Sequence, residues 1–118
     1  MSAEHVSRVA EQITSFSQVA ELGSGCHIRS VCLHGNRLTT IEPLHLPQLV
    51  HLNLSANSIQ CIENLTHLTT LRQLNLASNK LTQVAGLNGL KNLQLLNLAH
   101  NFIDSLAGLA TLHGQVRQ

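Results

Sequence analysis

The sequence predicts an α/β solenoid whose parallel sheet is built from successive, similar segments of the chain. Two observations carry this prediction. An asparagine recurs at intervals of 21, 22 and 22 residues, and each one is preceded by apolar residues that alternate with polar ones. A fixed period of this length is typical of architectures in which one supersecondary unit is stacked repeatedly along an axis. The recurring asparagines are Asn36, Asn57, Asn79 and Asn101.

Each full repeat is expected to begin with a short strand. Leu52-Asn53-Leu54 has an apolar period of two, and the pattern returns at residues 74–76 and 96–98. Leucine then points into the core and asparagine faces outward, and each strand pairs in parallel with the corresponding strand of the next repeat about 4.8 Å away. One repeat cannot bury its own leucine face, so stability depends on stacking between neighbours. The four full repeats start at Ile28, Leu49, Leu71 and Leu93.

The recurring asparagines are expected to be structural and to lie inside the turn that follows each strand. There the side-chain amide can satisfy buried backbone groups of the bend. Beyond the turn, apolar residues at three-residue spacing, such as Leu81, Val84 and Leu87, predict a convex side of short helical turns or extended segments. Pro43 and Pro47 fit a loop on that side, because proline has no backbone N–H to donate.

The N-terminal residues 1–25 are interpreted as a cap on the first repeat. Apolar side chains between residues 6 and 22 have helical spacing, which fits an amphipathic helix. Residues 13–19 also overlay residues 81–87 position by position, which fits a degenerate half-repeat. The second interpretation is favoured, so the prediction is four full repeats plus an N-terminal half-repeat.

The repeats are expected to occupy residues 26–114, with residues 115–118 a tail that starts a linker or coiled coil in a longer protein. No polar capping unit follows Leu106, Leu109 and Leu112. An uncapped repeat end exposes apolar surface. We therefore expect this end to be covered by the last residues or to associate with another copy of the chain.

The composition limits the classes of partner and compartment. The formal net charge is +1 and only 11% of residues are charged, so attraction to nucleic acid or to an anionic membrane is not expected. The cysteines Cys26, Cys32 and Cys61 are odd in number and have no paired spacing, which favours a reducing compartment over a disulfide framework. No signal peptide and no apolar run long enough to span a bilayer is present. A cytoplasmic location is expected.

The repeat resembles the 22-residue cytoplasmic class of leucine-rich repeats over residues 28–112. At a finer level, the N-terminal half-repeat, the LHGNRLTTIE stretch at residues 33–42 and the GLATLHG stretch at residues 108–114 resemble the N-terminal domain of the leucine-rich repeat and coiled-coil centrosomal family. That resemblance implies a module that targets or anchors a coiled-coil protein at the centrosome, centriole or ciliary basal body. A regulatory repeat protein that binds a phosphatase or motor subunit, or a structural self-association module, is the alternative.

The candidate partner-binding surface is the concave face of the sheet together with its rim. The row Asn53, Asn75 and Asn97 can hydrogen-bond an extended peptide or a helix of a protein partner, or its amides can bond one another along the sheet. Phe102 can anchor a partner or pack over the open end. The candidate binding residues are His34, His51, Asn53, Gln73, Asn75, Leu95, Asn97, Arg37, Lys80 and Phe102.

No catalytic residue, cofactor or metal ion is expected. Cys32 would face Asn53 on the adjacent strand, and a reactive thiolate needs an activating neighbour such as histidine. His45 and His67 occupy the same convex position of consecutive repeats, but two imidazoles without a third ligand make a poor zinc site. Nucleic-acid binding lacks an aromatic platform. The expected function is a non-enzymatic protein-interaction scaffold.

Overall fold

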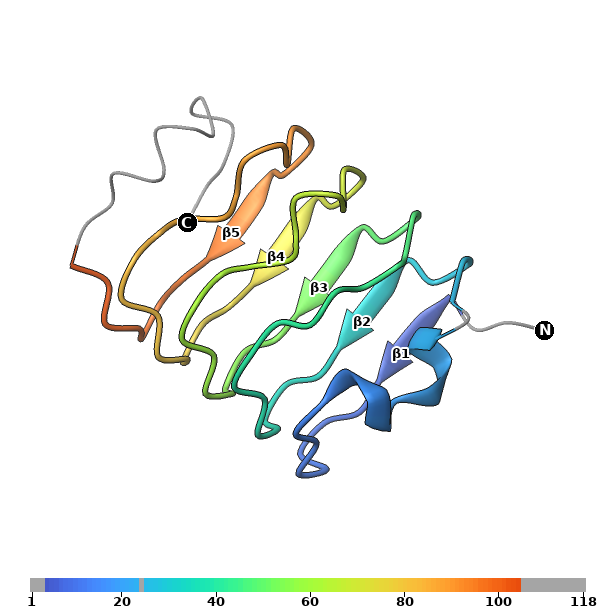
Figure 1. Cartoon of the computed structure of the whole chain (residues 1–118), viewed down its shortest axis with the longest axis horizontal. Coiled ribbons are helices and arrows are strands. Elements are labelled where there is room, and N and C mark those ends of the chain that lie inside the picture. Colours follow the sequence, from blue (N-terminus) through green and yellow to red (C-terminus); the bar gives the residue numbers. More distant parts are fainter. Residues whose placement is uncertain (1–3, 24, 105–118) are drawn as a thin grey trace.

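The computed structural model describes residues 4–23 and 25–104, and it shows a solenoid with one parallel sheet (Figure 1). The sheet has five strands, and their order in space follows the order of the chain. The predicted stack of repeats with a parallel sheet is therefore confirmed. The residues expected to form the open end and tail, 105–118, lie outside the described residues. The strands are β1 His5–Ser7, β2 Ser30–Cys32, β3 His51–Asn53, β4 Gln73–Asn75 and β5 Leu95–Asn97.

The middle residue of each strand faces the core, and these residues form one continuous row across the sheet. Val6 aligns with Val31, which aligns with Leu52 on the next strand. The row continues through Leu74 to Leu96, and every member is at most 2% exposed. Complete burial of such a side chain contributes about 1.5–3 kcal/mol. Because each repeat supplies one member, the core holds together only when neighbouring repeats are stacked.

The N-terminal segment is a repeat with a strand of its own, so both a half-repeat and a continuous helix over residues 6–22 were incomplete descriptions. β1 pairs in parallel with β2, and the segment continues into two short 3-10 helices, η1 Phe16–Gln18 and η2 Ala20–Gly23. The similarity of residues 13–19 to residues 81–87 predicted the core side chains of this segment correctly, because Ile13, Phe16 and Val19 are all buried on the convex side. The apolar spacing that suggested a helix belongs to the returning segment, which is the convex part of each repeat that leads from the turn back to the next strand.

The turn asparagines link each turn to the preceding repeat, and all but the half-buried Asn101 are buried. In Asn79, Nδ2 donates to the carbonyl oxygens of Leu76 and Ala77 in its own turn at 3.0 and 3.2 Å. The same nitrogen donates to Leu54 O at 3.0 Å, and Oδ1 accepts the N–H of Ile59 at 3.0 Å. The predicted role inside the bend is confirmed, and the bonds to residues 54 and 59 add a connection between repeats.

Glu42 connects the N-terminal repeat to the next one on the convex side. Its Oε1 accepts hydrogen bonds from the Ser15 hydroxyl and from the backbone N–H of Phe16, both at 2.8 Å. Ser15 is the N-cap of η1. The first N–H groups of a helical turn have no partner within that turn, so the carboxylate satisfies a group that would otherwise need water.

We expect Glu42→Ala to lower the free energy of unfolding by about 1 kcal/mol, the usual effect of losing a helix cap. Urea unfolding followed by circular dichroism measures this change. Glu63→Ala is the matched control, because Glu63 is exposed and no hydrogen bond of its side chain is found among the described residues. An equal effect of the two substitutions would contradict the capping role of Glu42.

No helix among residues 4–23 and 25–104 is long and apolar enough to cross a membrane.

Candidate functional site

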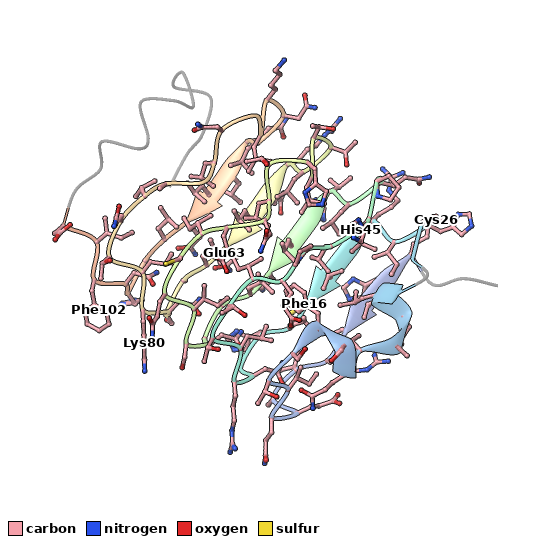
Figure 2. The ribbon with its side chains drawn as sticks, viewed as in Figure 1. Phe16, Cys26, His45, Glu63, Lys80 and Phe102 are labelled. Carbon is pink, nitrogen blue, oxygen red and sulfur yellow. The ribbon has the colours of Figure 1, made fainter. Side chains whose placement is uncertain are left out.

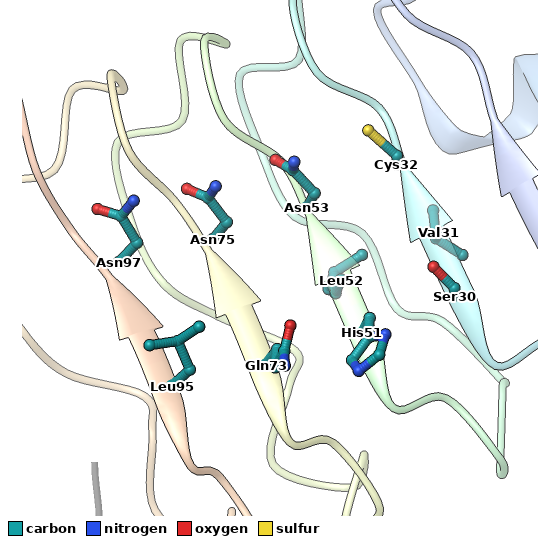
Figure 3. Close-up of a pocket in the computed structure, with 10 residues that line it drawn as sticks. All are labelled: Ser30, Val31, Cys32, His51, Leu52, Asn53, Gln73, Asn75, Leu95 and Asn97. Atoms are coloured by element: carbon teal, nitrogen blue, oxygen red, sulfur yellow. The ribbon is translucent and has the colours of Figure 1, made fainter. Parts of the chain in front are cut away.

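The outward-facing side chains of the strands form two parallel rows across the sheet (Figure 3). They line a shallow groove of about 520 Å³, which is the concave face proposed as the binding surface. The register of the strands fixes both rows, because equivalent residues of consecutive repeats are paired directly. The first row is Ser30, His51, Gln73 and Leu95, and the second is Cys32, Asn53, Asn75 and Asn97.

The amides of the second row are fixed by their own chain. Oδ1 of Asn53 accepts the backbone N–H of Ser55 at 2.9 Å, and Oδ1 of Asn75 accepts that of Ala77 at 3.0 Å. Asn97 repeats the arrangement with Ala99 at 3.0 Å. Among the described residues no hydrogen bond joins one of these amides to another. Of the two alternatives that the sequence left open, bonding between the amides along the sheet is therefore not found.

His34 lies next to the second row and joins it through a serine. Ser55 Oγ donates to Oδ1 of Asn53 at 2.6 Å, and His34 Nδ1 lies 2.6 Å from the same Oγ. The single hydroxyl proton is used on Asn53, whose Oδ1 can only accept, so His34 Nδ1–H donates to Ser55. This assignment leaves Nε2 of His34 as the ring nitrogen open to a ligand.

Of the three large apolar side chains that are exposed among the described residues, Val9 lies in the N-terminal repeat and the other two lie in the last described repeat. Leu95, at the end of the first row, is 45% exposed, and Phe102 is 69% exposed. Phe102 follows the turn asparagine Asn101, and its backbone N–H donates to Leu81 O at 2.8 Å, next to Lys80. Figure 2 shows Lys80 and Phe102 projecting from the same rim. The rim residues Arg37 and Lys80 are also exposed, as the repeat pattern predicts.

The concave face extends one strand further than the sequence analysis placed it. His5 and Ser7 of β1 align with Ser30 and Cys32, and His5 Nδ1 lies 2.9 Å from Ser30 Oγ. A signal for this strand was present in the overlay of residues 13–19 on 81–87. Val6 lies seven residues before Ile13, as Leu74 lies seven residues before Leu81.

Among the residues that the structure describes, the histidine and cysteine side chains do not gather into a candidate metal site. His45 and His67 do approach each other, with ring centroids 6.1 Å apart. His67 Nε2–H donates a hydrogen bond to Leu44 O at 2.5 Å, so this nitrogen is not available to a metal ion. Within the described part of the chain, no three His, Cys, Asp or Glu side chains are placed to hold a metal ion. The three cysteines are free thiols.

A comparison with protein families matches the description "Leucine Rich repeats (2 copies)" to residues 26–67 and 69–111. The match spans β2 to β5 and thus the larger part of the concave face. A comparison with curated protein sequences finds no significant match.

Solved structures with a similar fold include two internalins from Listeria monocytogenes. An internalin (inlF) superimposes with a TM-score of 0.81 at 27% identity, over 94% of this chain and 32% of that one. Internalin C2 (inlC2) superimposes with a TM-score of 0.82, also at 27% identity, over 96% of this chain and 49% of that one. The chain thus spans less than half the length of either structure.

Proposed function

The chain belongs to the leucine-rich repeat family, and we propose that it is a non-enzymatic scaffold whose concave face binds a partner protein. Repeat proteins of this family generally use such extended concave surfaces for interaction. The observation that carries the proposal is the amide row, which is formed by Asn53, Asn75 and Asn97 of the second row. Each Oδ1 accepts a hydrogen bond from the chain itself, and no hydrogen bond of the three Nδ2 atoms is found among the described residues, so they can donate to a ligand. A regular row of fixed donors suits recognition of a partner.

We expect Leu95→Arg and Asn75→Arg each to reduce partner capture by at least about tenfold, because a long charged side chain would occupy the groove and disrupt a packed contact. A quantitative pull-down with the immobilised chain measures the amount of captured partner. Gln83→Arg is the control, since Gln83 is an exposed residue on the returning segment with no side-chain hydrogen bond among the described residues. Undiminished capture by both groove variants would overturn the concave-face proposal.

We further propose that the chain is the targeting or anchoring module of a cytoplasmic coiled-coil protein at the centrosome, centriole or ciliary basal body. The resemblance of residues 33–42 and 108–114 to the centrosomal family supports this proposal. Fluorescence microscopy of the tagged full-length protein tests it against a centriole marker. Concentration at centrioles, and loss of that signal in the Asn75→Arg variant, is the expected result. A diffuse signal in the wild type would contradict it.

The alternative role is structural self-association through the end that carries Leu95 and Phe102. The exposure of these two side chains, 45% and 69%, favours it over the alternative of a repeat protein that binds a phosphatase or motor subunit. Sedimentation over a range of protein concentrations distinguishes the two roles. A dimer that is lost in Phe102→Ser but kept in Asn75→Arg would support self-association, and a monomer at all concentrations would exclude it.

A further inference from the structure

The amide row presents hydrogen-bond donors and hides its acceptors. In Asn53, Asn75 and Asn97 the backbone N–H two residues later occupies Oδ1, which also fixes which end of each amide is oxygen. Among residues 4–23 and 25–104 no hydrogen bond is found for the three Nδ2 atoms. Each nitrogen carries two protons, and at least one is therefore available to a ligand. A partner that satisfies this row has to supply acceptors.

Among the described residues, four cationic side chains lie at the edges of the sheet. Arg29 and Arg72 directly precede β2 and β4, at the edge where the strands begin. Arg37 and Lys80 follow the turn asparagines at the opposite edge, and both are exposed. The groove thus has cationic residues along two edges, although the formal net charge of the whole chain is only +1.

Most of the acidic side chains lie elsewhere, but Glu4 directly precedes β1 at the edge where the strands begin. Glu42 and Glu63 belong to the returning segments, and Glu42 is engaged by Ser15 and Phe16. Glu21 pairs with Arg8 within the N-terminal repeat, and the pKa of its carboxyl is lowered by a hydrogen bond to its own backbone N–H and then by Arg8. No outward-facing residue of β1 to β5 is acidic, and the acidic residues flanking β1 lie in the N-terminal repeat only. Around β2 to β5 the groove therefore complements negative charge.

The spacing of the donors distinguishes between two shapes of acidic partner. Equivalent residues on adjacent strands are about 4.8 Å apart. One turn of an α-helix advances about 5.4 Å, so carboxylates one turn apart differ from the donor row by only about 0.6 Å per step. In an extended segment, side chains on the same face are about 6.7 Å apart, and the mismatch grows to about 4 Å over two steps. A helix stays in register with the row and an extended segment does not.

The dimensions of the face also suit a helix that crosses the strands. Each strand has three residues and is about 10 Å long, while a helix with its side chains is about 10–12 Å wide. Five strands span about 19 Å, the length of about 13 helical residues. Nucleic acid fits less well, because stacking platforms for single strands are built from several aromatic side chains, and neither row contains Phe, Tyr or Trp.

We infer that the concave face recognises an acidic α-helix of its partner, which lies across the strands and directs carboxylates spaced by one turn at Asn53, Asn75 and Asn97. The inference rests on the proposed scaffold function and names the chemistry of the partner. Each carboxylate accepts a hydrogen bond from one Nδ2, and further acidic side chains of the helix approach the cationic residues at the two edges.

Binding to defined probes tests this inference by fluorescence anisotropy with the full chain. The first probe is a labelled helical peptide of about 14 residues with glutamate at every third or fourth position along one face. The second has glutamine in place of glutamate, and the third has the composition of the first but is kept extended by interspersed proline. The fourth is an oligothymidine of about 15 nucleotides. Only the first probe is expected to bind, and more weakly as salt concentration rises.

Two substitutions place negative charge in or beside the donor row without removing the hydrogen bonds that orient it. Asn75→Asp keeps an oxygen for the N–H of Ala77 but replaces the donor by an acceptor with negative charge. Gln73→Glu adds a charge beside it at an exposed residue whose side chain makes no hydrogen bond among the described residues, so it leaves folding unaffected. Each is expected to weaken binding of the acidic helix at least about tenfold, because like charges across an interface repel. Asn88→Asp, at an exposed residue of the returning segment, is the matched control and is expected to change binding less than about twofold.

The outcomes separate this inference from the scaffold function. Equal binding of the acidic and the glutamine peptide, preference for the extended or nucleic-acid probe, or unchanged binding by Asn75→Asp and Gln73→Glu would overturn the acidic-helix inference. The scaffold function would still stand if Leu95→Arg and Asn75→Arg abolished partner capture. Failure of those two variants to reduce capture would overturn the scaffold function itself.

Discussion

Substitution of Asn79 by aspartate is expected to lower the free energy of unfolding by about 4 kcal/mol, more than the loss of about 3 kcal/mol expected for Asn79→Ala. Asn79 is only 4% exposed. Its Nδ2 donates hydrogen bonds to three carbonyl oxygens. Aspartate would replace this donor by a second oxygen that faces the same three acceptors. Alanine merely leaves the polar groups without a partner, whereas aspartate adds an unpaired buried charge.

The effect of Asn79→Asp is expected to depend on pH. Burial among carbonyl oxygens disfavours the charged form, so the pKa of the new carboxyl is raised in the folded state above the unfolded value of about 3.9. The deficit relative to wild type is therefore largest above the raised pKa and shrinks as the pH falls toward the unfolded value. The protonated carboxyl can also donate to one of the carbonyl oxygens.

Urea unfolding at several pH values measures both effects. Asn88→Asp introduces the same chemical change at an exposed position, and we expect it to alter stability by no more than about 0.5 kcal/mol. If Asn79→Asp were as stable as Asn79→Ala at neutral pH, or its deficit did not shrink at low pH, the role of Asn79 as a donor between repeats would be refuted.

The strands β2 to β5 were predictable because each carries two independent signals. The alternation of Leu52-Asn53-Leu54 sets which side chains face the core, and the recurring asparagine sets where the turn lies. Together they fix the register, since a shift by one residue would move leucine to the solvent. The row of core residues and the two concave rows followed from this register and needed no further information.

The strand β1 was missed because its repeat lacks both signals. Arg8 stands where the other repeats have an inward leucine such as Leu33, and Glu11 stands where they have the turn asparagine. Backbone groups of this repeat are satisfied instead by Asn36 of the next one. Its Oδ1 accepts the N–H groups of Glu11 and Ile13, and its Nδ2 donates to Arg8 O. The repeat is thus completed by a neighbour, which a segment-by-segment comparison does not detect.

The orientation of the concave amides was not predictable for a different reason. Whether Asn53 bonds across the sheet or to its own chain depends on where the N–H of Ser55 points, and this follows from the turn. In that turn Ala56, Ser78 and His100 all have positive φ, between 56° and 58°. Ala, Ser and His seldom adopt positive φ, so the sequence does not reveal this turn conformation in three of the four repeats. Only Gly35, at the equivalent position of the first full repeat, indicates it.

The convex side also contains residues with positive φ, and at residue 86 only glycine fits without displacing its neighbours. Gly86 has φ +74°, and a Cβ at this position would lie 2.3 Å from the carbonyl oxygen of Ile62. The equivalent residue of the preceding repeat is Asn64, with φ 61°, whose Nδ2 donates to Ile41 O at 2.7 Å. Successive repeats approach closely at this point, so the backbone of one packs against a carbonyl group of the other.

We expect Gly86→Ala to lower the free energy of unfolding by about 3 kcal/mol. About 1–2 kcal/mol arises from placing an L-residue in the left-handed region, and a further 1–3 kcal/mol from the displacement of the Ile62 carbonyl. That carbonyl belongs to backbone, so it cannot be relieved by rotation of a side chain. Thermal and urea unfolding of the two proteins measure the difference.

Gly89→Ala separates the two contributions, because Gly89 also has positive φ, +86°, but its Cβ would meet Thr66 O at 3.4 Å. That distance needs little displacement, so we expect a loss of about 1 kcal/mol, set by φ alone. Equal losses at the two glycines would show that the close approach of repeats at Ile62 does not limit stability. A larger loss at Gly86 would place the tightest contact between repeats on the convex side, opposite the open groove that remains available for a partner.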